Sequence, residues 1–307
     1  ACIGCNQACI GRAHKGLTIS CIQYPESGRE LAFPPPEPAA TAKTVWVIGG
    51  GPAGMKAAAS AAQRGHRVTL FERGAQLGGQ ALLAQRLPGR EEFGGIVTNL
   101  QRELERAKVT VNCNREVDLA LIREQGPDSV ILATGAELKR VDNDNLDPGH
   151  LLSYEDVLLE RARPGKRVAI ADWRADWIGL GLAEKLAREG CSVKLMVNAA
   201  MAGESLQIYT RNHYVGRLYK LGVVIVPHAR IYGSDGTTVF LQNTLTDEAI
   251  IIEADSLLLS LGQQPLNRLE HELNDAGIAT RAIGDCLLPR TAEEAVYEGM
   301  IAGREID

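Results

Sequence analysis

Four cysteines near the amino terminus carry the most distinctive chemistry in this sequence. Cys2, Cys5, Cys9 and Cys21 are spaced C-x2-C-x3-C-x11-C, whereas the other three of the seven cysteines stand singly at distant positions. Three thiolates from one tight loop and a fourth from a nearby segment can hold an iron–sulfur cubane. The spacing therefore predicts a 4Fe–4S cluster bound by these four cysteines. A zinc ion on the same thiolates stays open as the alternative, although zinc sites more often use two C-x2-C pairs.

The cysteine pattern also bears on the cofactor and the compartment. An iron–sulfur cluster passes single electrons, so we expect a flavin nearby that can split an electron pair. Clustered cysteines without a disulfide framework indicate a reducing compartment, and the sequence opens without a signal peptide, so we expect a cytoplasmic protein. The chain starts at Ala1 rather than Met, with its first candidate ligand at residue 2, so we expect a further piece upstream.

A glycine fingerprint follows the first apolar strand of the sequence. Gly49, Gly51 and Gly54 form G-x-G-x-x-G between the run VWVIGG and an Ala-rich helix, and Glu72 ends the next strand 23 residues on. These glycines suit a tight turn, a close approach of pyrophosphate and helix–strand packing. Glu72 can accept both ribose hydroxyls of an adenosine and would repel a 2′-phosphate. The motif thus predicts a site for FAD, NAD or ADP rather than NADP.

Three later stretches favour a flavin dinucleotide at that site. LGGQ at 77–80 is a second glycine-rich turn, ATG at 133–135 ends a strand, and Gly284–Asp285 precedes the last predicted helix. An Asp at that position can bond the ribityl chain of a flavin. Each stretch alone is common, but their order together is specific to flavin-binding proteins.

The elements that must position these residues alternate between strands and helices. Predicted strands at 45–50, 66–72, 166–172 and 191–197 alternate with predicted helices, including 53–64, 178–189 and 292–304. Such alternation predicts parallel sheets in doubly wound layers. We therefore predict an α/β fold with two Rossmann-like domains preceded by a small iron–sulfur segment.

The domain borders follow from the linker and the two repeats. The Pro-rich run PPPEPAAT at 34–41 separates the cysteine segment from the first α/β unit. The predicted domains are an iron–sulfur segment and linker at 1–38, an FAD- or ADP-binding domain at 39–160 and 255–307, and an NAD(P)-binding-like domain at 161–254 with a degenerate glycine motif.

The order of these motifs resembles one family. CIGCNQACI, CIQYP, IGGGPAGM, TLFERGAQLGGQ, ILATG and IGDCLLPR are similar to the carboxyl-terminal half of the 2,4-dienoyl-CoA reductase / trimethylamine dehydrogenase family. Those old-yellow-enzyme-like proteins join an FMN-bearing barrel to an iron–sulfur segment and two domains like those of glutathione reductase. The resemblance implies a 4Fe–4S cluster on the four cysteines, and FMN on a barrel that this chain lacks.

The second βαβ unit, which binds NADPH in the reductases of that family, is altered here. Gly179 matches the third glycine of the fingerprint, but Arg174 and Asp176 occupy the places of the first two, and Asp172 adds another carboxylate. Two like charges near 4 Å oppose each other by about 4 kcal/mol at an effective dielectric constant of 20. We predict that this site does not bind a nicotinamide cofactor, the alternative being a variant that binds it through other contacts. The loss resembles the amine dehydrogenases.

This departure sets the predicted function. Without NAD(P)H, electrons are expected to leave from substrate through FMN and the cluster to an external acceptor, which the resemblance implies is an electron-transferring flavoprotein. The prediction is the electron-transfer module of an amine dehydrogenase or demethylase. The alternatives are part of an NAD(P)H-dependent enoate or 2,4-dienoyl-CoA reductase, and a non-redox subunit that binds ADP. The residues predicted to bind the nucleotide, FAD or ADP, are Gly49, Gly51, Pro52, Ala53, Gly54, Glu72, Arg73, Gly79, Gln80, Val117, Ala133, Thr134, Gly135, Gly284 and Asp285.

Composition excludes other classes of protein. The 33 Lys and Arg against 38 Asp and Glu give a net charge of −5, which argues against a nucleic-acid binder. No uncharged run approaches the roughly 20 residues of a membrane span. No residue for substrate conversion can be named, because such residues are expected on the barrel.

Overall fold

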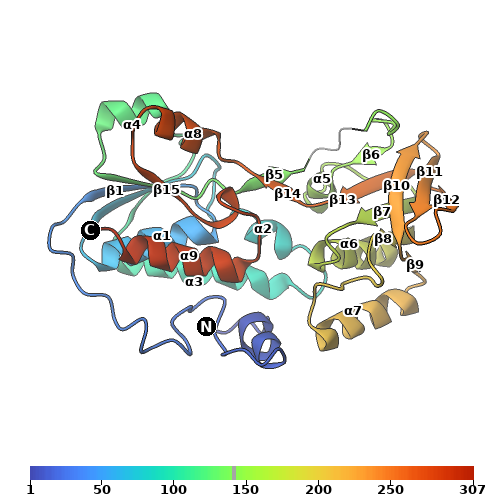
Figure 1. Cartoon of the computed structure of the whole chain (residues 1–307), viewed down its shortest axis with the longest axis horizontal. Coiled ribbons are helices and arrows are strands. Elements are labelled where there is room, and N and C mark those ends of the chain that lie inside the picture. Colours follow the sequence, from blue (N-terminus) through green and yellow to red (C-terminus); the bar gives the residue numbers. More distant parts are fainter. Residues whose placement is uncertain (140–142) are drawn as a thin grey trace. The chain divides into compact units, whose positions relative to one another are not determined.

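The computed structural model describes residues 1–139 and 143–307, which form two compact units (Figure 1). Unit 1 comprises residues 1–85, 92–137 and 263–307, and unit 2 comprises residues 86–91 and 138–262. Each unit contains a five-stranded parallel sheet with helices between its strands, so the predicted mixed α/β, Rossmann-like class is confirmed. The functional domains and borders drawn from the sequence stay a prediction.

Unit 1 is built on a sheet of order β15-β4-β1-β2-β3. Successive strand residues face opposite sides, and the apolar run of β1 fills both. Val45 and Val47 lie in the core formed with α1, α3 and α9, whereas Trp46 and Ile48 lie in the core formed with α4 and α8. Figure 1 shows these two groups of helices on opposite faces of the sheet. The elements are η1 (Gln7–Gly11), β1 (Thr44–Ile48), α1 (Pro52–Gln63), β2 (Arg67–Phe71), α2 (Ala81–Ala84), η2 (Glu91–Phe93), α3 (Gly94–Arg106), β3 (Thr110–Asn112), α4 (Leu119–Gln125), β4 (Ser129–Leu132), β5 (Ala136–Leu138), β14 (Gln263–Pro265), α8 (Arg268–Asp275), β15 (Thr280–Ala282), η3 (Gly284–Cys286) and α9 (Ala292–Arg304).

Helices α1 and α9 pack closely because α9 presents glycines to α1. A Cβ atom at Gly299 would lie 2.3 Å from the Ala53 carbonyl oxygen, and one at Gly303 would lie 2.5 Å from the Ala57 carbonyl oxygen. Only glycine therefore permits this approach of the two backbones. The contact holds the first turn of α1, where the glycine fingerprint ends, in a fixed place.

The amino-terminal segment, residues 1–33, packs against α3 and α9 within unit 1. Its buried side chains include Ile22, which is 1% exposed and belongs to the core formed with α1 and α3. Arg12 forms an ion pair with Glu293 at 3.0 Å, and Glu26 forms one with Arg304 at 3.1 Å. The segment that carries the four cysteines is thus tied to both ends of α9.

Unit 2 combines two sheets. The parallel sheet has the order β6-β13-β7-β8-β9, and β10, β11 and β12 form a separate antiparallel sheet. Its elements are β6 (Leu151–Leu152), α5 (Tyr154–Leu158), β7 (Arg167–Asp172), α6 (Trp177–Arg188), β8 (Ser192–Val197), α7 (Ile208–Lys220), β9 (Val224–Val226), β10 (Ala229–Ser234), β11 (Thr238–Asn243), β12 (Ala249–Glu253) and β13 (Ser256–Ser260).

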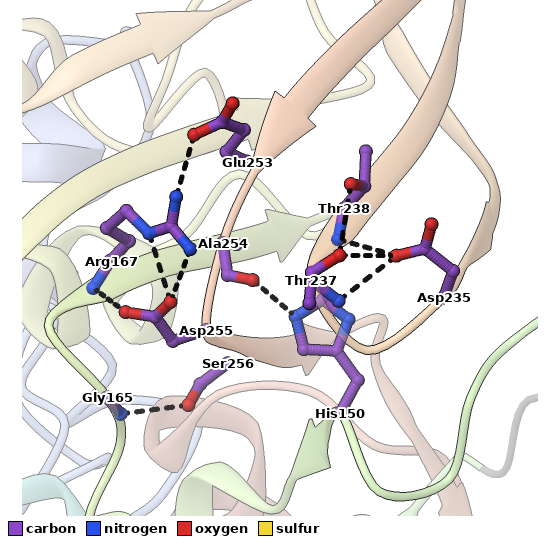
Figure 2. A network of polar contacts seen from close by, with 10 residues as sticks. All are labelled: His150, Gly165, Arg167, Asp235, Thr237, Thr238, Glu253, Ala254, Asp255 and Ser256. Atoms are coloured by element: carbon purple, nitrogen blue, oxygen red, sulfur yellow. Dashed lines mark hydrogen bonds and ion pairs between the residues drawn. The ribbon is translucent and has the colours of Figure 1, made fainter.

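A polar network fixes the corner where β12 turns into β13 (Figure 2). Arg167, at the start of β7, pairs with Glu253 at 2.7 Å and with Asp255 at 2.6 Å. The buried His150 has its Nε2 atom 3.1 Å from the Ala254 carbonyl oxygen. These contacts hold the start of β13 beside the start of β7. At the carboxyl ends of the two parallel strands, Ser260 of β13 lies opposite Asp172 of β7.

None of the helices within residues 1–139 and 143–307 has the length and apolar character needed to cross a membrane.

Candidate functional site

A cavity of about 430 Å³ lies in unit 1, where β1, β2 and β4 reach their carboxyl ends. Ligands of open α/β sheets bind at this edge. Five of the residues predicted from the sequence line the cavity: Gly49, Glu72, Arg73, Val117 and Thr134. Their convergence from four separate segments makes this cavity the candidate nucleotide site.

The glycine fingerprint forms the turn between β1 and α1. Gly49 has φ +112°, and a Cβ atom there would lie 2.1 Å from the Ala133 carbonyl oxygen. A Cβ atom at Gly54 would lie 1.9 Å from the Gly49 carbonyl oxygen, so the helix must come this close to the turn. At Gly51, by contrast, no described atom lies within 4 Å of such a Cβ, and the backbone faces open space. The turn therefore leaves room for a ligand beside Gly51.

Helix α1 begins at this turn with its amide groups available. Gly51 is the N-cap, Pro52 is the first helical residue and Ala53 follows it, and among the described residues no side chain caps this end. The first amides of a helix lack partners within the helix, and the helix dipole adds positive charge there. An anion such as a pyrophosphate suits this position.

Glu72 stands at the end of β2 on one wall of the cavity. Its Oε2 atom accepts the Gly50 N–H at 2.8 Å, and its Oε1 atom accepts the Gly74 N–H at 2.6 Å. A carboxylate oxygen has more than one acceptor position, so both oxygens can also accept hydroxyl groups. The backbone amides of Gly50 and Gly74 thereby fix the Glu72 carboxylate beside the glycine turn between β1 and α1.

The second glycine turn lies next to the first. A Cβ atom at Gly79 would be 3.2 Å from the Gly51 Cα atom. The Gln80 side chain donates to Asp285 Oδ2 at 3.4 Å and accepts from Gln263 Nε2 at 2.7 Å. The structure thus brings Gly51, Gly79, Gln80 and Asp285 together, although they are far apart in sequence.

The ATG stretch and Gly284 complete this arrangement. Thr134 Oγ1 donates to the Leu266 carbonyl oxygen at 2.5 Å, and the Leu266 N–H donates to the Gly135 carbonyl oxygen at 2.9 Å. Gly284, with φ +63°, donates its N–H to Glu298 Oε2 at 2.8 Å. The chain that returns from unit 2 therefore packs directly on the turn after β4.

Sequence reasoning missed several residues around the site. Arg115, Asp118, Leu266 and Arg268 line the cavity, and Gln263 contacts Gln80. Asp118 could have been expected near a helix start, because it caps α4 by accepting an N–H at 2.8 Å. The others carry no local signal.

The altered turn in unit 2 is closed by its own carboxylates. Asp172, with no exposed surface, accepts the N–H groups of Arg174 at 3.2 Å and Ala175 at 3.1 Å through Oδ1. A Cβ atom at Gly179 would lie 2.2 Å from Asp172 Oδ2, so the carboxyl group fills the space in front of the helix. Asp176 caps α6 by accepting the Ile178 N–H at 2.9 Å.

Two further contacts close this turn. Arg174 Nε is 2.7 Å from Asp176 Oδ2, which neutralises the capping carboxylate. The loop after β8 covers the turn, since the Ser205 N–H and hydroxyl both donate to the Ala175 carbonyl oxygen, at 3.1 and 2.8 Å. At α6, side-chain carboxyl groups therefore occupy the amides of Arg174 and Ala175 in the turn and of Ile178 in the helix, whereas no side chain caps the start of α1 among the described residues.

The environment of Asp172 alters its ionisation. The pKa of this carboxyl group is raised to about 8, first by burial and second by the neighbouring charge of Asp176. Ser260, its register partner on β13, lies beside it. Asp172 is therefore mostly protonated at neutral pH.

Cys5 lies close enough to Cys2, Cys9 and Cys21 to interact with each of them electrostatically. Burial raises the pKa of the Cys5 thiol, and charges on Cys9, Cys21 and Cys2 raise it too. The Gly4 N–H points to Cys2 Sγ at 3.3 Å. All four are free thiols, so their donor set suits a metal centre chemically.

Over residues 1–139 and 143–307, however, no three His, Cys, Asp or Glu side chains are already arranged to hold a metal ion. The metal centre at the cysteine segment therefore stays a prediction from spacing, proximity and donor type.

Comparison with known proteins identifies related chains. Residues 43–299 match the family model described as pyridine nucleotide-disulphide oxidoreductase. N,N-dimethylglycine/sarcosine dehydrogenase of Chromohalobacter salexigens is 31% identical over 97% of this chain and 49% of its own length. NADH oxidase of Thermoanaerobacter brockii is 32% identical over 97% of this chain and 46% of its own length.

A solved structure agrees with these relatives. The 6-hydroxypseudooxynicotine amine oxidase of Pseudomonas geniculata N1 has a TM-score of 0.90 and 29% identity, covering 99% of this chain and 48% of that one. The predicted resemblance to proteins that oxidise amines is confirmed. The chain spans about half the length of the curated relatives it matches.

Proposed function

The chain belongs to the pyridine nucleotide-disulphide oxidoreductase family, and from this membership we propose that it is the electron-transfer part of an iron–sulfur flavoprotein that oxidises or demethylates an amine. The family is one of oxidoreductases and its fold implies a flavin. Support for an amine as substrate comes from the relatives named for dimethylglycine, sarcosine and 6-hydroxypseudooxynicotine.

The observation that carries this proposal is the contrast between the two helix starts. Helix α1 begins at an uncapped glycine beside open space, whereas α6 begins at Asp176 with Asp172 filling the space in front of it. A dinucleotide therefore fits in unit 1 and is opposed in unit 2. Electrons from a nicotinamide cofactor would have no entry at α6, which favours electrons leaving toward an external acceptor.

We assign the unit 1 cavity to the adenosine and pyrophosphate of FAD, with ADP as the alternative. Glu72 would accept the ribose hydroxyls, and the start of α1 would receive the phosphates. Gln80 and Asp285 lie beside Gly51, where a longer ligand would continue. FAD and ADP both contain the adenosine and pyrophosphate groups that this cavity would contact, so the cavity does not distinguish them.

We assign the cysteine segment to a 4Fe–4S cluster held by Cys2, Cys5, Cys9 and Cys21. Such a cluster supplies one-electron transfer when bound. Four free thiols, with Cys5 close enough to the other three to interact electrostatically, support this ligand set, and zinc on the same thiols is the alternative. All seven cysteines are free, in keeping with a reducing compartment such as the cytoplasm.

The proposed partners are an FMN-binding barrel, fused or separate, and an electron-transferring flavoprotein. Support for the barrel is that each curated relative is about twice as long as the aligned chain. Substrate conversion would belong to that barrel, so no catalytic acid or base is assigned here.

The decisive experiment measures cofactors and then reduction by NADPH on the purified holoenzyme. Iron, acid-labile sulfide and released nucleotide are quantified per chain, the nucleotide by mass spectrometry. We expect four irons, four sulfides and FAD. Stopped-flow mixing with NADPH should leave both FAD and the FMN of the barrel oxidised, whereas an amine substrate should bleach the FMN.

The second candidate function is an NAD(P)H-dependent reductase, which the similarity to an NADH oxidase favours. Rapid bleaching of the flavin by NADH or NADPH would establish that alternative and overturn the proposed direction. ADP as the sole bound nucleotide, without iron or flavin, would instead support a structural subunit.

A further inference from the structure

We propose that Asn99 on α3 is a positioning residue for the cysteine segment, clamping the residue before Cys2 to the turn after Cys21. The inference rests on the proposed 4Fe–4S site and adds a residue outside the cysteine motif. It concerns how two ligands that are far apart in the motif are held together.

Asn99 contacts both sides of the motif with a single nitrogen. Its Nδ2 atom donates to the Ala1 carbonyl oxygen at 3.1 Å and to Gln23 Oε1 at 2.6 Å. Gln23 Nε2 donates to the same Ala1 oxygen at 2.5 Å, which closes a triangle of hydrogen bonds. An amide NH₂ group has two protons, so Asn99 uses both here.

The triangle bears directly on ligand placement. Ala1 immediately precedes Cys2, and Gln23 is two residues beyond Cys21. Gln23 is only 8% exposed, so water cannot readily replace a lost partner. Cys2 is the one exposed thiol among the four cysteines, which leaves it dependent on its neighbours for position.

A second contact on the same face of α3 acts on the same loop. Gly95 lies four residues before Asn99, so both face the same side of the helix. A Cβ atom at Gly95 would lie 2.7 Å from Ile3 Cγ2, and Ile3 is 8% exposed between Cys2 and Cys5. One face of α3 thus receives the residues on both sides of Cys2.

The loop that Asn99 holds also contains a hydrogen bond to the Cys2 sulfur atom. The Gly4 N–H points to Cys2 Sγ, and hydrogen bonds to cluster sulfurs help set a reduction potential. Release of Ala1 and Ile3 would shift this loop, and so would change both retention of the cluster and its potential.

The test compares Asn99→Leu and Gly95→Ala with Gln101→Leu, an amide two residues along the same helix. Each holoenzyme is mixed with an iron chelator, and iron loss is followed over time. An EPR-monitored titration gives the cluster potential. We expect Asn99→Leu to lose iron at least about ten-fold faster than the wild type, with a shifted potential, as when groups that orient metal ligands are removed.

Gly95→Ala probes the same face of α3 through its contact with Ile3, without altering the hydrogen bonds of Asn99. Ala is a better helix former than Gly, so this variant should not weaken α3 itself. It should nevertheless lose iron faster, because the new methyl group displaces Ile3. If Asn99→Leu is too unstable to purify, Asn99→Asp takes its place, because it keeps the size of the side chain and removes both donated protons.

The possible failures are distinguishable. A wild-type rate and potential in Asn99→Leu, with four irons in the wild type, would overturn the role of Asn99 and leave the proposed function intact, whatever the result for Gly95→Ala. A wild-type protein without iron or acid-labile sulfide would overturn the cluster assignment, and the clamp with it. An equally rapid loss from Gln101→Leu would show a general effect of α3 and would also overturn the inference.

Discussion

Asp172 is a carboxyl group without exposed surface at a place where related folds bind a phosphate. Two backbone amides point to its Oδ1 atom, and its other oxygen faces Gly179. Desolvation favours the neutral form, so the group gains a proton that the same residue lacks in the unfolded chain at neutral pH. The turn is thereby closed by a neutral acid and by the Arg174–Asp176 pair.

This ionisation predicts a pH dependence of stability. The folded pKa of about 8 lies above the ordinary value of 3.8, so the folded state binds one more proton between these two values. Stability from this group is full below about pH 4 and falls as pH rises toward 8, by up to about 1.4 kcal/mol per pH unit. Urea unfolding between pH 5 and 8, followed by tryptophan fluorescence, measures this slope.

Asp172→Asn is the matched variant for that measurement. The amide keeps an oxygen acceptor for the two N–H groups and cannot ionise. We expect its unfolding free energy to lose the decline with pH. An unchanged slope in the variant would show that Asp172 is already ionised in the folded protein.

At the scale of elements, α1 and α9 are joined by backbone contact rather than by large side chains. Gly299 and Gly303 bring α9 onto the alanine face of α1, and the capping box of Thr291 and Glu294 fixes the start of α9. The same helix lies between Gly284, which bonds Glu298, and the cysteine segment, which bonds Glu293. A shift of α9 would therefore disturb both predicted sites.

Gly299→Ala should destabilise the protein although alanine favours helices. Its Cβ atom would meet the Ala53 carbonyl oxygen at 2.3 Å, and overpacking of this kind costs about 1–3 kcal/mol. Gly216→Ala in α7 is the control, because no described atom lies within 4 Å of its Cβ position. The control should gain up to about 1 kcal/mol from helix propensity.

Denaturant unfolding of the two glycine variants checks this prediction. Opposite signs of the change in unfolding free energy are expected. Equal gains in both variants would mean that α1 and α9 do not pack as closely as described.

At the scale of the whole molecule, the amino-terminal segment depends on a few polar ties. Arg12–Glu293 and Glu26–Arg304 connect it to α9, and Asn99 connects it to α3. Its surface leaves Leu17, Ile19 and Leu31 at least half exposed. A bound cluster would add four covalent ties to a segment that has little core of its own.

Removal of iron should therefore loosen this segment selectively. After chelation, hydrogen exchange should accelerate in residues 1–33 and in the turn of α3 around Asn99. Exchange in β7, β8 and β13 of unit 2 should stay unchanged, because none of these strands carries a predicted ligand. Uniform exchange before and after chelation would contradict a structural role for the cluster.

The sequence alone determined the features that depend on short-range geometry. The glycine turn and the parallel α/β elements are recognisable because each follows from local backbone and patterning requirements. Gly49 must adopt a positive φ, and Gly54 must tolerate a carbonyl oxygen against its Cα. The predicted helix 292–304 is confirmed at both ends, since a capping box and an apolar periodicity mark it.

Only the tertiary structure decided which distant residues meet. Leu266 and Arg268 line a cavity that begins at Gly49, and Asn99 bonds Ala1 across nearly a hundred residues of chain. These contacts depend on how strands and helices stack, and a single side chain carries no local mark of its eventual neighbour. The same is true of Asp172. Its place in the sequence suggested that it would repel the phosphates of a nucleotide, whereas burial in the folded chain favours a neutral carboxyl group that fills the space beside Gly179.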